Sequence, residues 1–265
     1  MLTVLLSHER SGSHLLSELV RASGVITYDE VCNPHAMPPE TQPASFHRFR
    51  HDWQISHPEF LRAPDPVSQL RFNEAYFRHL IELAAPHPVT IDMKYGHLHN
   101  FNETWCPPLA RPTFFASCEY TGTKILHLHR TNKLEAVVSA KLAHRRQYYH
   151  SWQNSDGQPF EPEELDCKEI VGETILLMEQ SKLVSERWLS GVAHLSITYE
   201  DLTHAVKSVD NNFQLKVASF LGGTFGGPLT PKHQKIGRGL RQDVSNYSEL
   251  VSACRGTVLE EFCDC

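Results

Sequence analysis

The sequence lacks a long apolar run, and no stretch approaches the roughly 20 residues that a membrane-spanning helix requires. Its N-terminus has no basic segment and no small-residue cleavage site, so we expect no secretory signal peptide. It also lacks an excess of positive charge, because 25 Lys and Arg residues stand against 31 Asp and Glu residues, a net charge of −6. This balance argues against general nucleic-acid binding, and an anionic ligand would need a local positive site.

Cysteine is sparse and irregularly spaced. The chain has seven cysteines, an odd number. Cys106 and Cys118 are not at metal-ligand spacing, and we expect Cys263 and Cys265 to lie on a C-terminal tail. A cytoplasmic protein with reduced thiols fits this pattern.

Histidine, in contrast, is abundant at 17 residues, so no histidine is assigned a role on its type alone. We interpret His97 with His99, and His127 with His129, as alternation along two strands. A zinc site would need three or four convergent ligands, and we expect no metal.

The sequence has no internal repeat and no low-complexity tract, and 265 residues suit one domain spanning 1–265. Apolar runs alternate with helical patterns, which predicts an α/β fold with a parallel sheet covered by helices on both faces. The predicted strands are 2–6, 88–95, 124–130 and the AHLSIT segment, and the predicted helices are 13–21, 67–84, 132–147 and 162–189. Residues 33–66 are predicted to form a long irregular excursion, and residues 150–165 a polar loop.

The first motif is SHERSGSH, where the apolar run Leu2–Leu6 stops and an amphipathic helix begins. One glycine, several serines and Arg10 provide backbone N–H groups at a helix N-terminus together with a cation, which is typical of a phosphate-binding loop. It is not a Walker A loop, because the glycine spacing differs and no lysine precedes Ser13. The alternative is an ordinary strand–helix turn with a surface arginine.

The second motif is RTNKLEAVVS, at the end of another predicted strand. Ser139 lies nine residues after Arg130, inside the following helix. At a rise of about 1.5 Å per residue this is more than two turns, so only a sizeable ligand such as a nucleotide's ribose phosphate could touch both. The alternative is a helix-capping segment with an exposed arginine.

Two further segments complete the pattern. Tyr199 in ITYEDL stands at a strand-to-helix junction, where it could pack on a base or be an ordinary buried tyrosine before an acidic first turn. In KIGRGLRQD, three cationic residues surround two glycines. These residues are Lys235, Arg238 and Arg241. This segment could bind a phosphate as a second site, or it could be a solvated basic loop.

In this order, the four segments resemble sulfotransferases that use 3′-phosphoadenosine 5′-phosphosulfate (PAPS). HERSGSHLLSEL is similar to that family's 5′-phosphosulfate loop, and RTNKLEAVVS is similar to its 3′-phosphate motif. ITYEDL resembles the strand that places a tyrosine at the adenine, and RGLRQD resembles the late loop that closes over the 3′-phosphate. The Arg-to-Ser spacing is closest to the bacterial carbohydrate sulfotransferases. Residues 33–89 and 148–193 are not covered.

The resemblance implies a P-loop-kinase-like three-layer sandwich and transfer of a sulfuryl group from PAPS to an acceptor hydroxyl, without a metal. It implies that Arg10 contacts the sulfate and the leaving phosphate. The implied loop residues are Ser11, Gly12, Ser13, His14 and Leu15. The implied 3′-phosphate site consists of Arg130, Ser139, Arg238 and Gly239, with Tyr199 at the adenine.

Two residues compete as the base that takes the acceptor's proton. Glu30 and Asn33 resemble the Glu and Asn of a bacterial G-E-x-x-N segment. His97 follows Lys94 as the histidine follows the lysine in the K-T-H segment of cytosolic animal enzymes, but the spacing here is one residue longer. We favour Glu30, and keep His97 as the alternative. Lys94 could assist the transferring group or pair with Asp92, which shares its strand face.

Two other functions remain open at this stage. The chain could be a non-catalytic module that binds 3′-phosphorylated nucleotides, or a small-molecule kinase with an altered phosphate loop. We expect residues 33–66 and 148–162 to form the acceptor pocket. The aromatic residues of the segments outside the resemblance would fit a carbohydrate, a glycolipid or another small molecule equally well. A carbohydrate or glycolipid acceptor is therefore expected by family analogy alone. The sequence predicts no oligomeric state.

Overall fold

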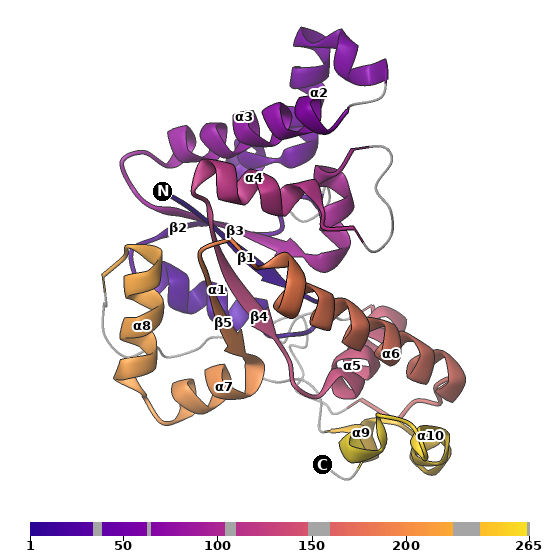
Figure 1. Cartoon of the computed structure of the whole chain (residues 1–265). Helices are drawn as coiled ribbons and strands as arrows, with labels where there is room; N and C mark the ends of the chain where they lie inside the picture. The colour runs from indigo at the N-terminus through magenta and orange to yellow at the C-terminus, as the bar shows by residue number, and fades with distance from the viewer. Residues whose placement is uncertain (34–38, 63–64, 104–109, 148–159, 225–238, 264–265) are drawn as a thin grey trace.

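Figure 1 shows the computed structural model, in which a five-stranded sheet lies between two groups of helices. The structure describes residues 1–33, 39–62, 65–103, 110–147, 160–224 and 239–263. The strands are β1 (Leu2–Ser7), β2 (Ile26–Tyr28), β3 (Val89–Lys94), β4 (Lys124–His129) and β5 (His194–Thr198). Their order in the sheet is β2-β3-β1-β4-β5, and all four pairings are parallel. The predicted parallel sheet is therefore confirmed.

The described helices include short C-terminal ones as well as the long helices that cover the sheet. They are α1 (Ser13–Ala22), α2 (Phe46–Ser56), α3 (Pro66–Ala84), α4 (Thr113–Thr121), α5 (Lys133–Arg146), α6 (Cys167–Leu183), α7 (Tyr199–Lys207), α8 (Asn211–Leu221), α9 (Leu240–Asp243) and α10 (Tyr247–Cys254). Short 3-10 helices occupy Pro39–Ala44, Pro58–Arg62, Tyr95–Phe101 and Glu260–Phe262, and a π-helical turn, Val184–Trp188, continues α6.

The sheet buries both of its faces. Alternate residues of β1 point to opposite sides: Val4 packs into a cluster with α3 and α4, whereas Leu5 packs into a cluster with α1, α7 and α8. A third apolar cluster joins α5 and α6 to α9 and α10. Because a strand that is covered on both sides needs apolar side chains on both, the run LTVLL carries no polar alternation.

The prediction of a long irregular excursion over residues 33–66 is wrong in part. This segment contains α2 and two 3-10 helices. Its prolines flank α2 and do not interrupt it. The Ser45 hydroxyl accepts the Arg48 N–H at the N-terminus of α2, and the fully buried Phe46 ring packs edge-on against Phe72 and Tyr76 of α3. Aromatic burial therefore stabilises a helix that the proline content concealed.

Other boundaries also differ from the sequence prediction. Helix α6 begins at Cys167, not at residue 162, because the Asp166 carboxylate accepts the N–H groups of Lys168 and Glu169 and caps the helix there. The short strand β2 and helix α4 were not predicted at all. His97 and His99 lie in a 3-10 helix, not on a strand.

The cysteines are free thiols wherever the structure describes them, at Cys32, Cys118, Cys167, Cys254 and Cys263. Cys263, near the C-terminus, is buried in the third apolar cluster. In the described ranges, no helix combines the length and the apolar character needed to cross a bilayer.

A buried histidine predicts how stability depends on pH. Burial, followed by the nearby charges of His129 and Lys133, lowers the pKa of His127 to about 3, and its Nε2 lies 2.6 Å from the Tyr95 hydroxyl. The unfolded chain, with a histidine pKa near 6.5, binds more protons between these values, so stability falls as the pH falls through this window. Between pH 7 and pH 5, His127 should account for a loss on the order of 2 kcal/mol.

Urea unfolding of His127→Gln at the two pH values checks this. The variant should lose less stability on acidification than the wild type, and the exposed His87→Gln variant serves as the control. Equal pH dependence of the wild type and His127→Gln would contradict the assignment.

Candidate functional site

Parallel pairing brings three strand ends to one edge of the sheet. Ser7, the last residue of β1, lies in register with Lys94 at the end of β3 and with Leu128 near the end of β4. The segments that follow these strands therefore leave the sheet side by side. Crevices at the carboxyl edge of such sheets are where ligands of α/β proteins commonly bind.

The loop between β1 and α1 folds tightly at this edge. The Ser11 hydroxyl donates to the His8 carbonyl at 2.7 Å, and Arg10 and Gly12 have positive φ angles of 59° and 88°. A Cβ atom at Gly12 would lie 2.6 Å from Cδ2 of Tyr199, so only glycine fits under that ring. The first and third motifs of the sequence are thus in contact.

A second contact joins the first and second motifs. The Arg10 Nε donates to the Ser139 hydroxyl at 3.2 Å, across 129 positions of the chain. Burial, and then the charge of Arg130, lowers the pKa of Arg10 from its usual value. Two guanidinium groups are therefore gathered close to one loop, which is the local positive site that a protein of net negative charge needs for an anion.

Arg130 is the more buried of the two arginines, with 5% of its surface exposed. Its guanidinium lies 4.7 Å from the centre of the Tyr199 ring and forms an ion pair with Glu135. Its Nε is buried and has no hydrogen-bond partner in the described part of the chain. A buried donor without a partner is costly, and an anionic ligand would remove that cost.

The N-terminus of α5 is fixed from two sides. The Glu200 carboxylate accepts the Thr131 N–H at 3.0 Å and the Asn132 N–H at 3.5 Å, and the Asn132 side chain caps the helix at the Glu135 N–H. The Lys133 ammonium donates to the Arg130 carbonyl. Burial lowers the pKa of Lys133 to about 8. The negative charge of Glu200 raises this pKa, whereas the positive charge of Arg130 lowers it further.

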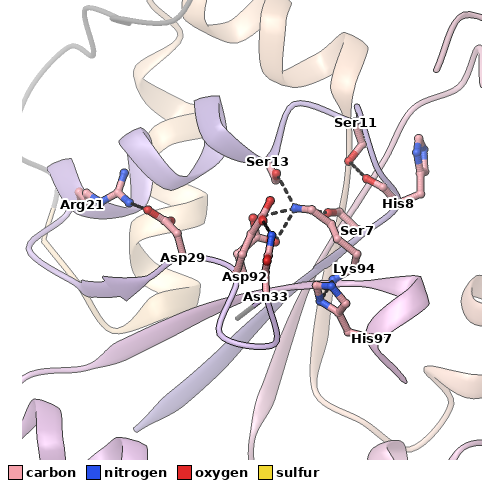
Figure 2. A network of polar contacts seen from close by, with 11 residues as sticks. Ser7, His8, Ser11, Ser13, Arg21, Asp29, Asn33, Asp92, Lys94 and His97 are labelled. Carbon is pink, nitrogen blue, oxygen red and sulfur yellow. Dashed lines mark hydrogen bonds and ion pairs between the residues drawn. The ribbon is translucent and has the colours of Figure 1, made fainter. Parts of the chain in front are cut away.

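Lys94 reaches the loop from β3. Figure 2 shows its ammonium between three side chains: Nζ donates to the Ser13 hydroxyl and to both Asp92 carboxylate oxygens at 2.7 Å, and to the Ser7 hydroxyl at 3.4 Å. Asp92 and Lys94 are buried and form an ion pair. The prediction that they share a strand face is therefore confirmed. A lysine thus stands at Ser13 although the loop itself contains none.

Glu30 lies just beyond β2, in a turn where its φ is 41°. Its carboxylate accepts a hydrogen bond of 3.0 Å from the Asn33 amide, which joins the two residues of the predicted Glu-x-x-Asn pair. Burial alone would raise the pKa of Glu30, but the Lys94 charge and the Asn33 hydrogen bond, with His14 and His97, outweigh it and lower the pKa. Glu30 is therefore ionised at neutral pH.

His97 stands in the same neighbourhood but differs in chemistry. Its Nδ1 accepts the backbone N–H of Lys94 at 3.2 Å, and burial together with the Lys94 charge lowers its pKa (Figure 2). A neutral imidazole whose Nδ1 accepts a hydrogen bond carries its proton on Nε2. His97 can therefore donate a proton from Nε2 but has no free lone pair to take one.

The remaining predicted residues have mixed positions. The half-buried Leu15 side chain packs against the second apolar cluster. Gly239 precedes α9, and its N–H donates to the Asp243 carboxylate at 3.3 Å. Arg238 and Lys235 lie outside the described residues, so the fourth motif is described only from Gly239 onward.

Sequence reasoning missed three residues of this site. His8 is buried, accepts the Arg130 backbone N–H at 3.1 Å, and has a pKa that burial lowers to about 3. Glu135 and Glu200 were quoted within the motifs but not assigned. The position of His8 directly after a buried strand could have identified it as a site residue from the sequence. No local sequence pattern indicates that Glu200 contacts the N-terminus of α5.

In the described ranges, no group of three or more His, Cys, Asp or Glu side chains is arranged to hold a metal ion. Comparison of the sequence with known protein families and with curated proteins finds no match. The case for a function therefore rests on the residues and contacts of the site itself.

The close contact under Tyr199 gives a direct test of the loop geometry. Gly12→Ala should lower the free energy of unfolding through both a strained positive φ and a clash with the Tyr199 ring. Gly122→Ala is the matched control, because Gly122 has a φ of 67° but nothing within 4 Å of the added Cβ. The expected losses are about 1 kcal/mol for the control and about 2–3 kcal/mol for Gly12→Ala, measured by urea unfolding. Equal losses would mean that the ring does not press on the loop.

Proposed function

We propose that this chain is a sulfotransferase that moves the sulfuryl group of PAPS to an acceptor hydroxyl. The observation that carries the proposal is the bond from Arg10 to Ser139, which joins the loop after β1 to helix α5. The resemblance assigns these two residues to the 5′-phosphosulfate loop and to the 3′-phosphate motif. A nucleotide with phosphates on both its 5′ and 3′ positions would span this pair.

A P-loop-kinase-like identity of the sheet belongs to the same proposal. The loop follows β1, the central strand, and leads directly into α1, so backbone N–H groups at the N-terminus of α1 face the carboxyl edge. The 3′-phosphate would take Arg130, whose buried Nε lacks a partner among the described residues, together with Ser139. Tyr199 would lie beside the adenine, and Gly239 with Arg238 would complete the 3′-phosphate site.

In the proposed reaction, a bond forms between the acceptor oxygen and sulfur while the bond from sulfur to the 5′-phosphate oxygen breaks. Arg10 would stabilise the negative charge that develops on the departing phosphate. The Lys94 ammonium, held at Ser13, would reach the transferring group from β3, the strand next to β1. The acceptor proton would pass to Glu30, which is ionised and therefore able to accept it.

The second candidate is a phosphoryl-transferring kinase. One observation favours it: Lys94 brings an ammonium from β3 to Ser13, the residue that a lysine would directly precede in a Walker A loop. The third reading, a binding module without transfer, would bind the bisphosphate nucleotide but sulfate no acceptor.

Nucleotide-dependent thermal stability separates the kinase from the two functions that use a 3′-phosphorylated nucleotide, and only a transfer assay separates those two from each other. With 3′-phosphoadenosine 5′-phosphate at about a hundred times its dissociation constant, stability should rise by about 2.7 kcal/mol, more than with 5′-AMP or ATP. Arg10→Ala and Arg130→Ala should each weaken this binding by at least about tenfold, because each removes a charge-assisted contact. Arg71→Ala, at an exposed arginine of α3, is the control. A shift that follows ATP would instead favour the kinase, and no shift with any nucleotide would contradict both.

The base can be identified by a pair of conservative variants. Glu30→Gln should lower kcat for transfer by about 10²–10⁴ while leaving the dissociation constant of the donor nearly unchanged. His97→Gln should have a much smaller effect, since the His97 lone pair is already engaged by the Lys94 N–H. Release of 3′-phosphoadenosine 5′-phosphate from PAPS in the presence of a screened acceptor provides the assay. Inactivity of His97→Gln with an active Glu30→Gln would reverse the assignment.

A further inference from the structure

The anion site at the start of α5 contains acidic side chains as well as cations. Glu135, in the first turn of α5, forms an ion pair with Nη2 of Arg130. Glu200 occupies the backbone N–H groups of Thr131 and Asn132. The donors that a phosphate would use at this helix N-terminus are therefore partly engaged by carboxylates of the same chain.

The two carboxylates are not equivalent. Glu200 holds backbone N–H groups and ties the β5–α7 junction to the β4–α5 junction, which is a structural role. Glu135 instead holds the guanidinium that would bind the ligand, and 22% of its side chain is exposed against 6% for Arg130. A partly exposed carboxylate can turn toward water, whereas the buried guanidinium is fixed over the Tyr199 ring.

A phosphate at Arg130 would meet this carboxylate directly. A guanidinium binds a phosphate best through two parallel N–H donors. Both edges that offer two such donors, Nε with Nη2 and Nη1 with Nη2, include the Nη2 that Glu135 already uses. The carboxylate and the phosphate also carry charge of the same sign, so their closeness costs free energy. Binding therefore requires either displacement of Glu135 or acceptance of its repulsion.

We infer that Glu135 is an internal competitor for Arg130 and weakens the binding of a nucleotide 3′-phosphate at this site. The inference rests on the proposed function, because it takes the 3′-phosphate of the donor and of its desulfated product as the competing anion. It assigns Glu135 to affinity control, a role separate from sulfuryl transfer.

The proposed reaction gives such a competitor a purpose. The donor and the product carry the same 3′-phosphate, so this contact binds both equally and adds nothing to the transition state. A very tight 3′-phosphate site would hold the product and slow its release. A carboxylate that returns to Arg130 as the product leaves lowers the affinity without altering the reacting atoms.

Isothermal titration calorimetry of the full chain with two nucleotides tests this inference. Glu135→Gln keeps the size of the side chain and removes its charge. It should bind 3′-phosphoadenosine 5′-phosphate about tenfold more tightly than the wild type, as expected when a close like charge is removed. Its affinity for 5′-AMP, which lacks the 3′-phosphate, should change little.

Two controls separate competition from other causes. Glu74→Gln removes the carboxylate of an exposed Arg–Glu pair on α3 and so makes the same change in net charge away from the site. It should bind both nucleotides as the wild type does. Cooperative thermal unfolding of ligand-free Glu135→Gln establishes that the variant is folded.

The outcomes are distinct. Selective tightening for the 3′-phosphorylated nucleotide supports the inference. Weaker binding by Glu135→Gln would mean that Glu135 positions Arg130 for the ligand, and equal tightening for both nucleotides would mean a general charge effect; either overturns it. If the wild type and Glu135→Gln both fail to bind 3′-phosphoadenosine 5′-phosphate, the proposed function fails and the inference falls with it.

Discussion

The parallel register of β1 with β3 and β4 is the constraint on which the rest of the site depends. Because Ser7 and Lys94 end their strands beside Leu128, the next-to-last residue of β4, the loop at residues 8–12, the 3-10 helix after β3 and the start of α5 must leave from one edge. Segments more than 80 residues apart in sequence thereby come within hydrogen-bond distance, as Lys94 and Ser13 do. The apolar residues of β1, which pack on both faces of the sheet, hold this register in place.

Electrostatic compensation is the second organising feature. Each buried cation whose contacts are described above has an acidic neighbour or a hydrogen-bond acceptor: Lys94 has Asp92, Arg130 has Glu135, and Lys133 has the Arg130 carbonyl. Burial of an unpaired charge is costly, so these partners make a cluster of positive charge compatible with folding. The same partners limit how strongly the cluster can attract an anion. Stability and ligand affinity are therefore opposed at this edge of the sheet.

Much of the fold was readable from the sequence. The apolar runs at β1, β3 and β4 and the amphipathic pattern of α1 are strong local signals, and the alternation of strands with helices predicts parallel pairing. Helix α2 was missed because prolines flank it and because its apolar face consists largely of aromatic residues among histidines and arginines. The short β2 was missed because three residues carry no detectable period.

The sequence predicted individual residues of the site but not the contacts between them. The resemblance to sulfotransferases implied that Arg10, Ser139, Arg130 and Tyr199 belong to one site. Strand alternation put Asp92 and Lys94 on one face, which left their pairing as one of two alternatives for Lys94. The link from Arg10 to Ser139, the contact of Gly12 with the Tyr199 ring and the reach of Glu200 to α5 depend on tertiary distances that no local pattern encodes. The preference for Glu30 over His97 stays a prediction, now with a physical reason in the hydrogen bond that occupies the His97 lone pair.

The central claim is that one nucleotide bridges the loop after β1 and the start of α5. A crystal structure of the chain with 3′-phosphoadenosine 5′-phosphate tests it most directly. We expect the 5′-phosphate at the N–H groups of residues 11–15 and the 3′-phosphate within hydrogen-bond distance of Arg130 and Ser139, with Glu135 turned away from the guanidinium. A nucleotide bound elsewhere, or one whose 3′-phosphate points to solvent, would contradict it.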